Sequence, residues 1–198
     1  AQEALAQFDL DQVLFMPAGD APHKSGHGAP PEFRYLLVAT ATAGNPCFSV
    51  SRFEIDRNQV SYTVDTLEHL AGIVPQGTEM FFITGADAVL EILTWKDPVR
   101  VLELSAFIAA TRPGYDLSRL SGLLEELRSK TVGLVPEARV KIMEVPALAI
   151  SSSMIRERLA AGKTVRYLVP DPVAELIDKS GYYKAGGPQA TGRERCRS

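Results

Sequence analysis

The chain has 198 residues, of which 45% are hydrophobic, 8% aromatic and 23% charged, and its formal net charge is −3. A charge this small excludes binding to nucleic acid or to an anionic membrane through bulk electrostatics, so any anion site must be built locally. The length suits one buried core. We expect a single domain over 1–183 and a disordered tail over 184–198, because the tail has no apolar pattern.

The two cysteines, Cys47 and Cys196, lie far apart and form no metal-ligand spacing. Such a pair is typical of a reduced protein rather than of a disulfide scaffold. No apolar run approaches the roughly 20 residues that cross a bilayer, and the first residues lack the pattern of a signal peptide. We therefore expect a cytoplasmic protein with neither a membrane partner nor a nucleic-acid partner.

Apolar periodicity predicts helices and strands in alternation along the chain. In chain order, we expect a helix over 1–8, a strand over 12–17, a helix over 32–42, a strand over 48–55, a helix over 62–73, a strand over 79–84, helices over 88–93 and 98–104, a strand over 106–110, a helix over 117–130, a strand over 140–145, a helix over 154–161 and a last helix from 170 or 171 to about 180. The segment 1–8 has the pattern of the second half of a helix, with no capping residue ahead of it. We expect an upstream strand and turn to precede it.

Most of these strands are apolar throughout, which is typical of a parallel sheet covered by helices on both faces. In such α/β sheets, ligands bind at the carboxyl ends of the strands. The first donor-rich loop in that position follows the strand over 12–17, where prolines and a glycine precede His23 and Lys24. This pair could bind a phosphate, or it could belong to a solvated surface loop.

Three further clusters follow strands. Gly85 would let a ligand approach the backbone, while Asp87 could either accept ribose hydroxyls or cap a helix. The group Ser151, Ser152, Ser153 and Arg156 lies at a strand-to-helix junction, where free amides form an anion site, although serine is also an ordinary helix cap. In the fourth cluster, Trp95 could stack on an aromatic ligand or belong to the core; Lys96 follows it, and Arg112 ends the next strand.

Taken together, these segments resemble the bacterial nicotinate-nucleotide adenylyltransferases of the nucleotidyltransferase superfamily. The resemblance extends to about Tyr183 and rests on VLFMPAGDAPHK, SYTVDTL, FFITGADA, LTWKD, ATRPGY, VPALAISSSMIRERL and RYLVPDPV, in that order. It implies a Rossmann-like nucleotidyltransferase fold with a parallel sheet. It also implies transfer of the adenylyl group of ATP to nicotinate mononucleotide, which yields nicotinate adenine dinucleotide and pyrophosphate for NAD biosynthesis.

The resemblance also implies roles for the matching residues. ATP phosphates would be bound by Ser151, Ser152 and Arg156, and the adenosine ribose by Gly85 and Asp87. The pyridine ring of nicotinate mononucleotide would stack on Trp95, its carboxylate would be bound by Thr63 and the backbone around Lys96, and its pocket would be supported by Arg112. The phosphate channel would be lined by His23 and Lys24 as supporting catalytic residues, with Mg²⁺ entering with ATP. The resemblance identifies no metal ligands and allows a homo-oligomer.

The family begins with a strand, a Gly-Gly-Thr-Phe-Asp-Pro-type turn and a His-x-Gly-His motif, whereas residues 1–4 match the middle of the helix that follows. We therefore expect the chain as given to retain ligand binding with little or no turnover, and its sheet to lack the first strand. Ser153 stands where threonine is usual, and Ala21 where proline is common. Two other interpretations stay open: a non-catalytic nucleotide-binding protein, and a related enzyme such as pantetheine-phosphate adenylyltransferase.

Overall fold

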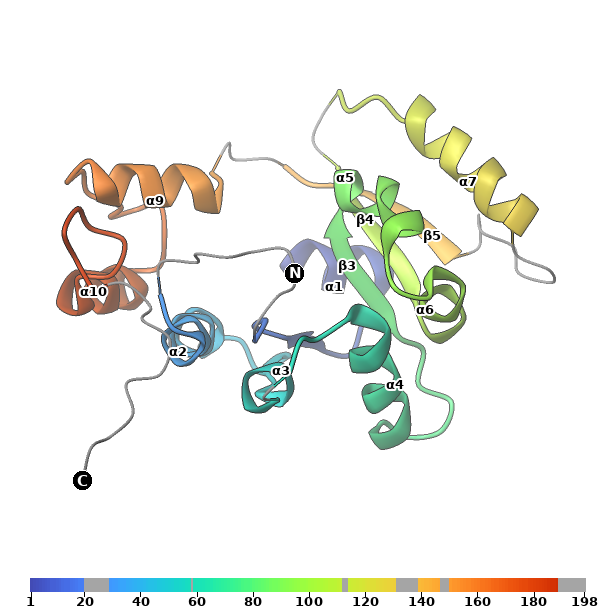
Figure 1. Cartoon of the computed structure of the whole chain (residues 1–198), viewed down its shortest axis with the longest axis horizontal. Coiled ribbons are helices and arrows are strands. Elements are labelled where there is room, and N and C mark those ends of the chain that lie inside the picture. The colour runs from blue at the N-terminus through green and yellow to red at the C-terminus, as the bar shows by residue number, and fades with distance from the viewer. Residues whose placement is uncertain (20–28, 58, 112–113, 131–138, 147–149, 189–198) are drawn as a thin grey trace. The chain divides into compact units, whose positions relative to one another are not determined.

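A computed structural model describes residues 1–19, 29–57, 59–111, 114–146 except 131–138, and 150–188. The chain forms two compact units, each with its own core. Unit 1 comprises Ala1–Asp11 and Tyr62–Ala147, and unit 2 comprises Gln12–Ser61 and Leu148–Ser198. Figure 1 shows the elements of both units.

Unit 1 is built on a parallel sheet of three strands in the order β3 (Phe81–Gly85), β4 (Ala106–Thr111) and β5 (Val140–Glu144). In the register, Phe82 lies opposite Phe107 and Ala109 lies opposite Ile142. The central strand β4 is almost wholly buried, which explains why its sequence is apolar without alternation.

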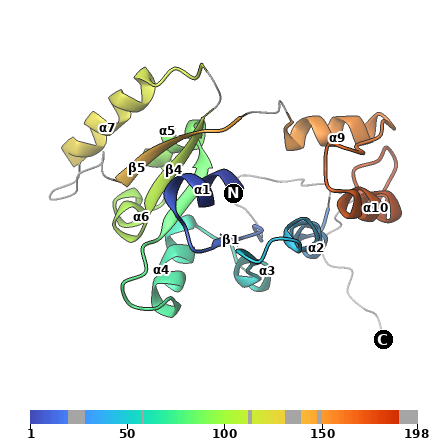
Figure 2. The same ribbon diagram turned by 180° about the vertical axis from the view of Figure 1, so that it is seen from behind.

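Successive side chains of β4 point to opposite faces of this sheet, and each face has its own core. Phe107 and Ala109 belong to the larger cluster, whereas Ile108 packs with Ala4 of α1 (Gln2–Phe8). Figure 2 shows α1 in front of β4 and β5. The larger cluster is completed by residues of α4 (Thr63–Ile73), α5 (Ala86–Leu90), the 3₁₀ turn η1 (Ile92–Thr94), α6 (Pro98–Leu104) and α7 (Ser118–Lys130). Helices thus cover both faces, as the sequence predicts.

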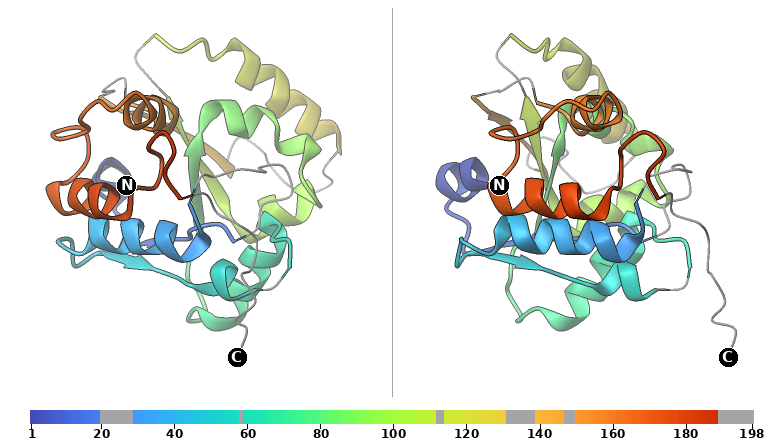
Figure 3. Two further views of the ribbon diagram at one scale, coloured as in Figure 1. Left: turned by 60° about the vertical axis from the view of Figure 1, so that its left-hand side comes forward. Right: turned by 90° about the vertical axis from the view of Figure 1, so that its left-hand side faces the viewer.

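Unit 2 contains a parallel pair of short strands, β1 (Val13–Phe15) and β2 (Phe48–Val50), together with four helices among its described residues. These helices are α2 (Pro31–Thr42), α3 (Phe53–Asp56), α9 (Ser152–Ala160) and α10 (Asp171–Ser180). Its core joins Ile155 and Leu159 of α9 to Val173 and Ile177 of α10, with Leu37 of α2 packed against them. Figure 3 shows α10 running beside α2.

The predicted strand over 48–55 is wrong in its second half, where the chain forms α3. Its partner β1 offers only three residues for pairing, so β2 ends at Val50. Beyond that point the Ser51 hydroxyl accepts a hydrogen bond from the Phe53 backbone N–H (3.1 Å), which turns the chain into a helix. The predicted helix over 88–93 is likewise divided, into α5 and η1.

The remaining predicted elements are confirmed, and each of their ends differs from the predicted end by two residues or fewer. Both described sheets are parallel, as an α/β nucleotidyltransferase fold requires. Within the described residues, no helix is both long and apolar enough to span a membrane.

Candidate nucleotide-binding site

Gly85 and Asp87 lie where β3 ends and α5 begins, the position at which parallel sheets bind ligands. Gly85 is exposed, has a φ of −69° and would leave an added Cβ in open space. Its backbone is therefore accessible, although its conformation does not require glycine. Asp87 does not cap α5: its Oδ1 accepts a hydrogen bond from the Tyr115 hydroxyl at 3.0 Å.

Trp95 follows η1 and is half-buried. Its ring meets Phe82 edge-on, with centroids 5.7 Å apart, and it lies 6.0 Å from the ring of Phe107. The indole is thus fixed on the edge of the unit 1 core while part of it remains accessible. Both sequence interpretations of Trp95 describe part of this arrangement, because the ring packs on the core without being enclosed by it.

Lys96 connects the Trp95 segment to the first turn of α4. Its Nζ lies 2.9 Å from Oδ1 of Asp65 and 4.7 Å from the ring centroid of Tyr62. Tyr62 and Asp65 stand on either side of Thr63 in the sequence, so the structure brings Thr63 and Lys96 into one neighbourhood. The family resemblance groups these two residues, but no sequence pattern identifies Asp65 or Tyr62, since neither the ion pair nor the ring contact is local in sequence.

Ser151, Ser152 and Arg156 lie in unit 2, at the start of α9. Ser151 is the N-cap residue, and its hydroxyl accepts a hydrogen bond from the Met154 backbone N–H at 3.1 Å. Both serines and Arg156 are exposed. The capping interpretation is therefore correct for Ser151, and it is compatible with an anion site because the amides at the helix start stay accessible.

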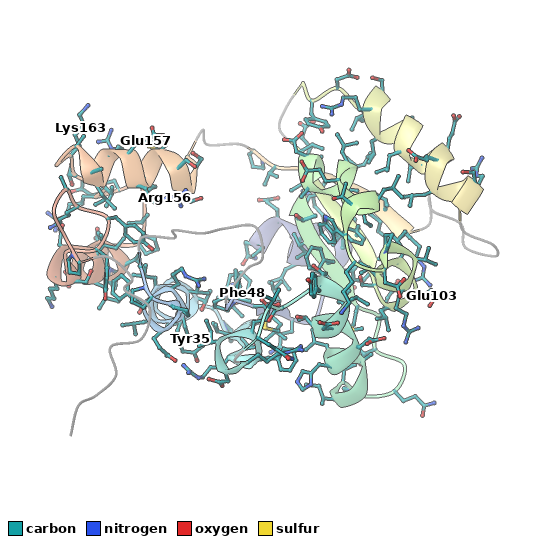
Figure 4. All side chains as sticks on the ribbon, in the orientation of Figure 1. Tyr35, Phe48, Glu103, Arg156, Glu157 and Lys163 are labelled. Atoms are coloured by element: carbon teal, nitrogen blue, oxygen red, sulfur yellow. The ribbon has the colours of Figure 1, made fainter. Side chains whose placement is uncertain are left out.

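Arg156, labelled on α9 in Figure 4, donates from Nη2 to the Ser153 hydroxyl at 3.2 Å. A second arginine of unit 2, Arg34 of α2, influences the same side chain as Arg156, which is the phenol of Tyr183. Burial raises the pKa of Tyr183, while the positive charges of Arg34 and Arg156 act in the opposite direction. The positive charges of both arginines therefore act on one side chain of unit 2. No sequence pattern identifies Arg34, because it lies inside a helix, far from any motif.

Arg34 also fixes the beginning of the loop that follows β1. Its Nη2 donates to the carbonyl oxygen of Gly19 at 3.0 Å. Gly19 is buried, and a Cβ at this position would collide with the carbonyl oxygen of Glu54. His23 and Lys24, further along this loop, and Arg112 after β4 lie outside the described residues.

Five predicted site residues (Thr63, Gly85, Asp87, Trp95 and Lys96) therefore belong to unit 1, and three (Ser151, Ser152 and Arg156) belong to unit 2. In the part of the chain that the structure describes, no three His, Cys, Asp or Glu side chains gather as metal ligands. Within unit 1, the exposed Asp87 carboxylate and the partly accessible Trp95 indole suit hydroxyl-bearing and aromatic groups of a ligand. Within unit 2, the accessible amides at the start of α9 and the Arg156 guanidinium suit an anionic group.

A parallel α/β sheet with donor-rich segments after its strands defines a nucleotide-binding protein class. The chain matches the cytidylyltransferase-like family model over residues 1–158. It belongs to this family and, within it, to the nicotinate-nucleotide adenylyltransferase branch.

Three curated relatives show the extent of the similarity. A probable nicotinate-nucleotide adenylyltransferase of Streptomyces coelicolor is 47% identical over 93% of this chain and 91% of its own length. Another, from a Nocardioides species, is 44% identical over 98% of this chain and 90% of its own length. A third, from a Thermoanaerobacter species, is 44% identical over 93% of this chain and 85% of its own length.

Proposed function

We propose that the protein represented by this chain has the activity of its family branch, which is transfer of the adenylyl group of ATP to nicotinate mononucleotide to give nicotinate adenine dinucleotide and pyrophosphate in NAD biosynthesis. The observation that carries the proposal is the similarity to curated adenylyltransferases at 44–47% identity over almost the whole chain. Two features support it separately: in unit 1 the segment after β3 leaves the Asp87 carboxylate accessible, and in unit 2 the start of α9 leaves backbone N–H groups accessible.

For ATP, we assign the phosphates to Ser151, Ser152 and Arg156. The helix start supplies backbone N–H donors and a favourable dipole, and Arg156 one turn further on supplies a fixed positive charge. We assign the ribose to Gly85 and Asp87, because an exposed backbone and an exposed carboxylate can bind sugar hydroxyls. Arg34 joins this assignment as a second source of positive charge in unit 2.

For nicotinate mononucleotide, we assign ring stacking to Trp95, whose indole is held against Phe82 and Phe107. Thr63 and the backbone around Lys96 would donate hydrogen bonds to the pyridine carboxylate, and the contacts of Lys96 with Tyr62 and Asp65 keep these segments together. We assign Arg112 to the same pocket.

The proposed chemistry is an in-line displacement at the α-phosphorus of ATP. A phosphate oxygen of nicotinate mononucleotide forms the new P–O bond, and the bond between the α-phosphorus and the bridging oxygen to the β-phosphate breaks. Pyrophosphate leaves with that electron pair. The protein supplies positioning and charge neutralisation rather than a nucleophile, and we assign His23 and Lys24 to this supporting role.

Nucleotidyl transfer of this kind uses a divalent cation. We propose that Mg²⁺ arrives as the counterion of ATP, as part of the substrate, because this ion keeps several waters and binds through substrate phosphates with one or two carboxylates. We propose that the protein acts in the cytoplasm, where both substrates are found. The proposed reaction is also compatible with assembly into a homo-oligomer.

The test is pyrophosphate release from ATP and Mg²⁺ in the presence of nicotinate mononucleotide, nicotinamide mononucleotide or 4′-phosphopantetheine. The 198-residue chain and any longer product that its coding region specifies should both be assayed. Turnover with nicotinate mononucleotide as the preferred acceptor supports the proposal. Turnover with 4′-phosphopantetheine alone would assign a related adenylyltransferase, and nucleotide binding without turnover in every form would assign a non-catalytic binding protein.

A further inference from the structure

We propose that Tyr115 is a positioning residue for the ribose site: its hydroxyl holds one oxygen of the Asp87 carboxylate so that the other can accept a hydrogen bond from a ribose hydroxyl. This inference rests on the role proposed above for Asp87. It adds a residue from the segment after β4 to a site otherwise formed by the segment after β3.

The contact that carries the inference joins residues 28 positions apart. The Tyr115 hydroxyl donates to Asp87 Oδ1 at 3.0 Å, and among the described residues it is the one hydrogen-bond donor to this carboxylate. Asp87 itself is exposed. An exposed aspartate samples several rotamers, so a ligand that requires one of them loses binding free energy to the conformational entropy of the side chain. The hydrogen bond from the Tyr115 phenol reduces this loss because it holds Asp87 in one rotamer before the ligand binds.

Tyr115 can fix Asp87 because it is itself fixed. Its half-buried ring packs against the larger core cluster of unit 1. On one side, Gly114 has a φ of +79°, a left-handed conformation that suits glycine. On the other side, Asp116 accepts a hydrogen bond from the Ser118 backbone N–H at 2.9 Å, at the start of α7. The phenol therefore lies between a left-handed glycine and a turn that the Asp116 hydrogen bond closes.

The protonation states agree with this role. The backbone hydrogen bond from Ser118 is the largest cause lowering the pKa of Asp116, so this anchor is an ionised acceptor at neutral pH. Burial, and then the hydrogen bond to Asp87, raise the pKa of Tyr115 above its ordinary value near 10.0. The phenol is consequently protonated at neutral pH and remains a donor.

The experiment compares the wild-type chain with Tyr115→Phe, which removes the hydroxyl and keeps the ring. Calorimetric titration with ATP, 2′-deoxy-ATP and 3′-deoxy-ATP separates the contribution of each ribose hydroxyl. Tyr35→Phe, on α2 in unit 2, is the matched control for the loss of a phenol hydroxyl. We expect Tyr115→Phe to weaken ATP binding by about 3- to 10-fold, the size of a partly exposed charge-assisted hydrogen bond.

The same substitution should leave the affinity unchanged for the deoxy-nucleotide that lacks the hydroxyl bound by Asp87. It should also have no further effect in an Asp87→Ala background, because positioning acts only through that carboxylate. If Tyr115→Phe lowered the affinity for all three nucleotides equally, or left the affinity for ATP unchanged, the role of Tyr115 would be overturned. The proposed function would stay intact. Wild-type chain that binds ATP and both deoxy-nucleotides equally would overturn the ribose role of Asp87 together with this inference.

Discussion

The Lys96 ammonium lies 2.9 Å from the carboxylate of Asp65, an ion pair that joins the segment after η1 to the first turn of α4 across 31 positions of sequence. Asp65 is the less exposed partner, with 22% of its side chain accessible against 51% for Lys96. The pair thereby holds Trp95, which precedes Lys96, near the helix that carries Thr63.

We expect Asp65→Asn to weaken binding of nicotinate mononucleotide by up to about fivefold, because a partly exposed ion pair contributes at most about 1 kcal/mol. The loss should shrink at high salt, where the pair is screened. Quenching of Trp95 fluorescence by the mononucleotide, titrated at low and high salt, measures both effects. Glu68→Gln is the matched control, since it removes the Arg100 pair (3.3 Å) between α4 and α6 without touching Lys96. An equal effect of both substitutions would contradict the prediction.

Ser151 allows capping and anion binding to be separated. Ser151→Ala removes the acceptor for the Met154 N–H and should lower the free energy of unfolding by about 1 kcal/mol. Ser151→Asp keeps a capping oxygen and should preserve stability, but its negative charge should reduce ATP affinity more than the alanine change does. Urea denaturation and ATP titration of both variants check the two effects. ATP affinity unaltered by Ser151→Asp would place the phosphates elsewhere.

Phe107 connects the core of unit 1 to Trp95. It is fully buried, and its ring lies 6.0 Å from that of Trp95. Phe107→Ala should lower the free energy of unfolding by about 3–5 kcal/mol and shift the Trp95 emission to longer wavelength, because the cavity admits water beside the indole. Ile108→Val, on the opposite face of β4, should cost about 0.5–1.5 kcal/mol without the spectral shift. A red shift in both variants would be inconsistent with the packing described.

Gly19 should not tolerate a side chain. A Cβ there would collide with the carbonyl oxygen of Glu54, so Gly19→Ala should lower the free energy of unfolding by about 1–3 kcal/mol through a forced backbone shift. At Gly44 the same substitution meets nothing within 4 Å and should be neutral or slightly stabilising. Chemical denaturation of the two variants compares their stability. Equal denaturation midpoints would show that the backbone at Gly19 accommodates a Cβ without loss of stability.

The pair of Glu32 and Arg52 predicts a dependence of stability on pH. Two hydrogen bonds from Arg52, at 2.9 and 2.7 Å, lower the pKa of Glu32 below its ordinary value of 4.5. The stabilisation is therefore fully present above pH 4.5 and is lost as the pH falls through the lower, folded-state pKa. Glu32→Gln should have a lower urea midpoint than the wild type at pH 7, and the difference should shrink as the pH falls below 4.5. A difference between the two midpoints that is the same at every pH would contradict the prediction.

Much of this architecture could be predicted from the sequence because its causes are local. Apolar runs identified all three strands of unit 1, and serine before a helical pattern identified the cap at Ser151. Motif order identified the family that the curated relatives confirm. Each of these signals lies within a few neighbouring residues, where the chain's own periodicity and hydrogen-bonding groups determine the outcome.

The tertiary structure decided what depends on partners far along the chain. The end of β2 was set by the length of β1, and the hydrogen-bond partner of the Asp87 side chain is Tyr115 rather than its own helix. Asp65 was identified through its ion pair with Lys96, and Arg34 through the effect of its charge on the pKa of Tyr183. Sequence patterns identify which residues can pair, but folding brings particular distant side chains within hydrogen-bonding distance, and only that distance selects the partner.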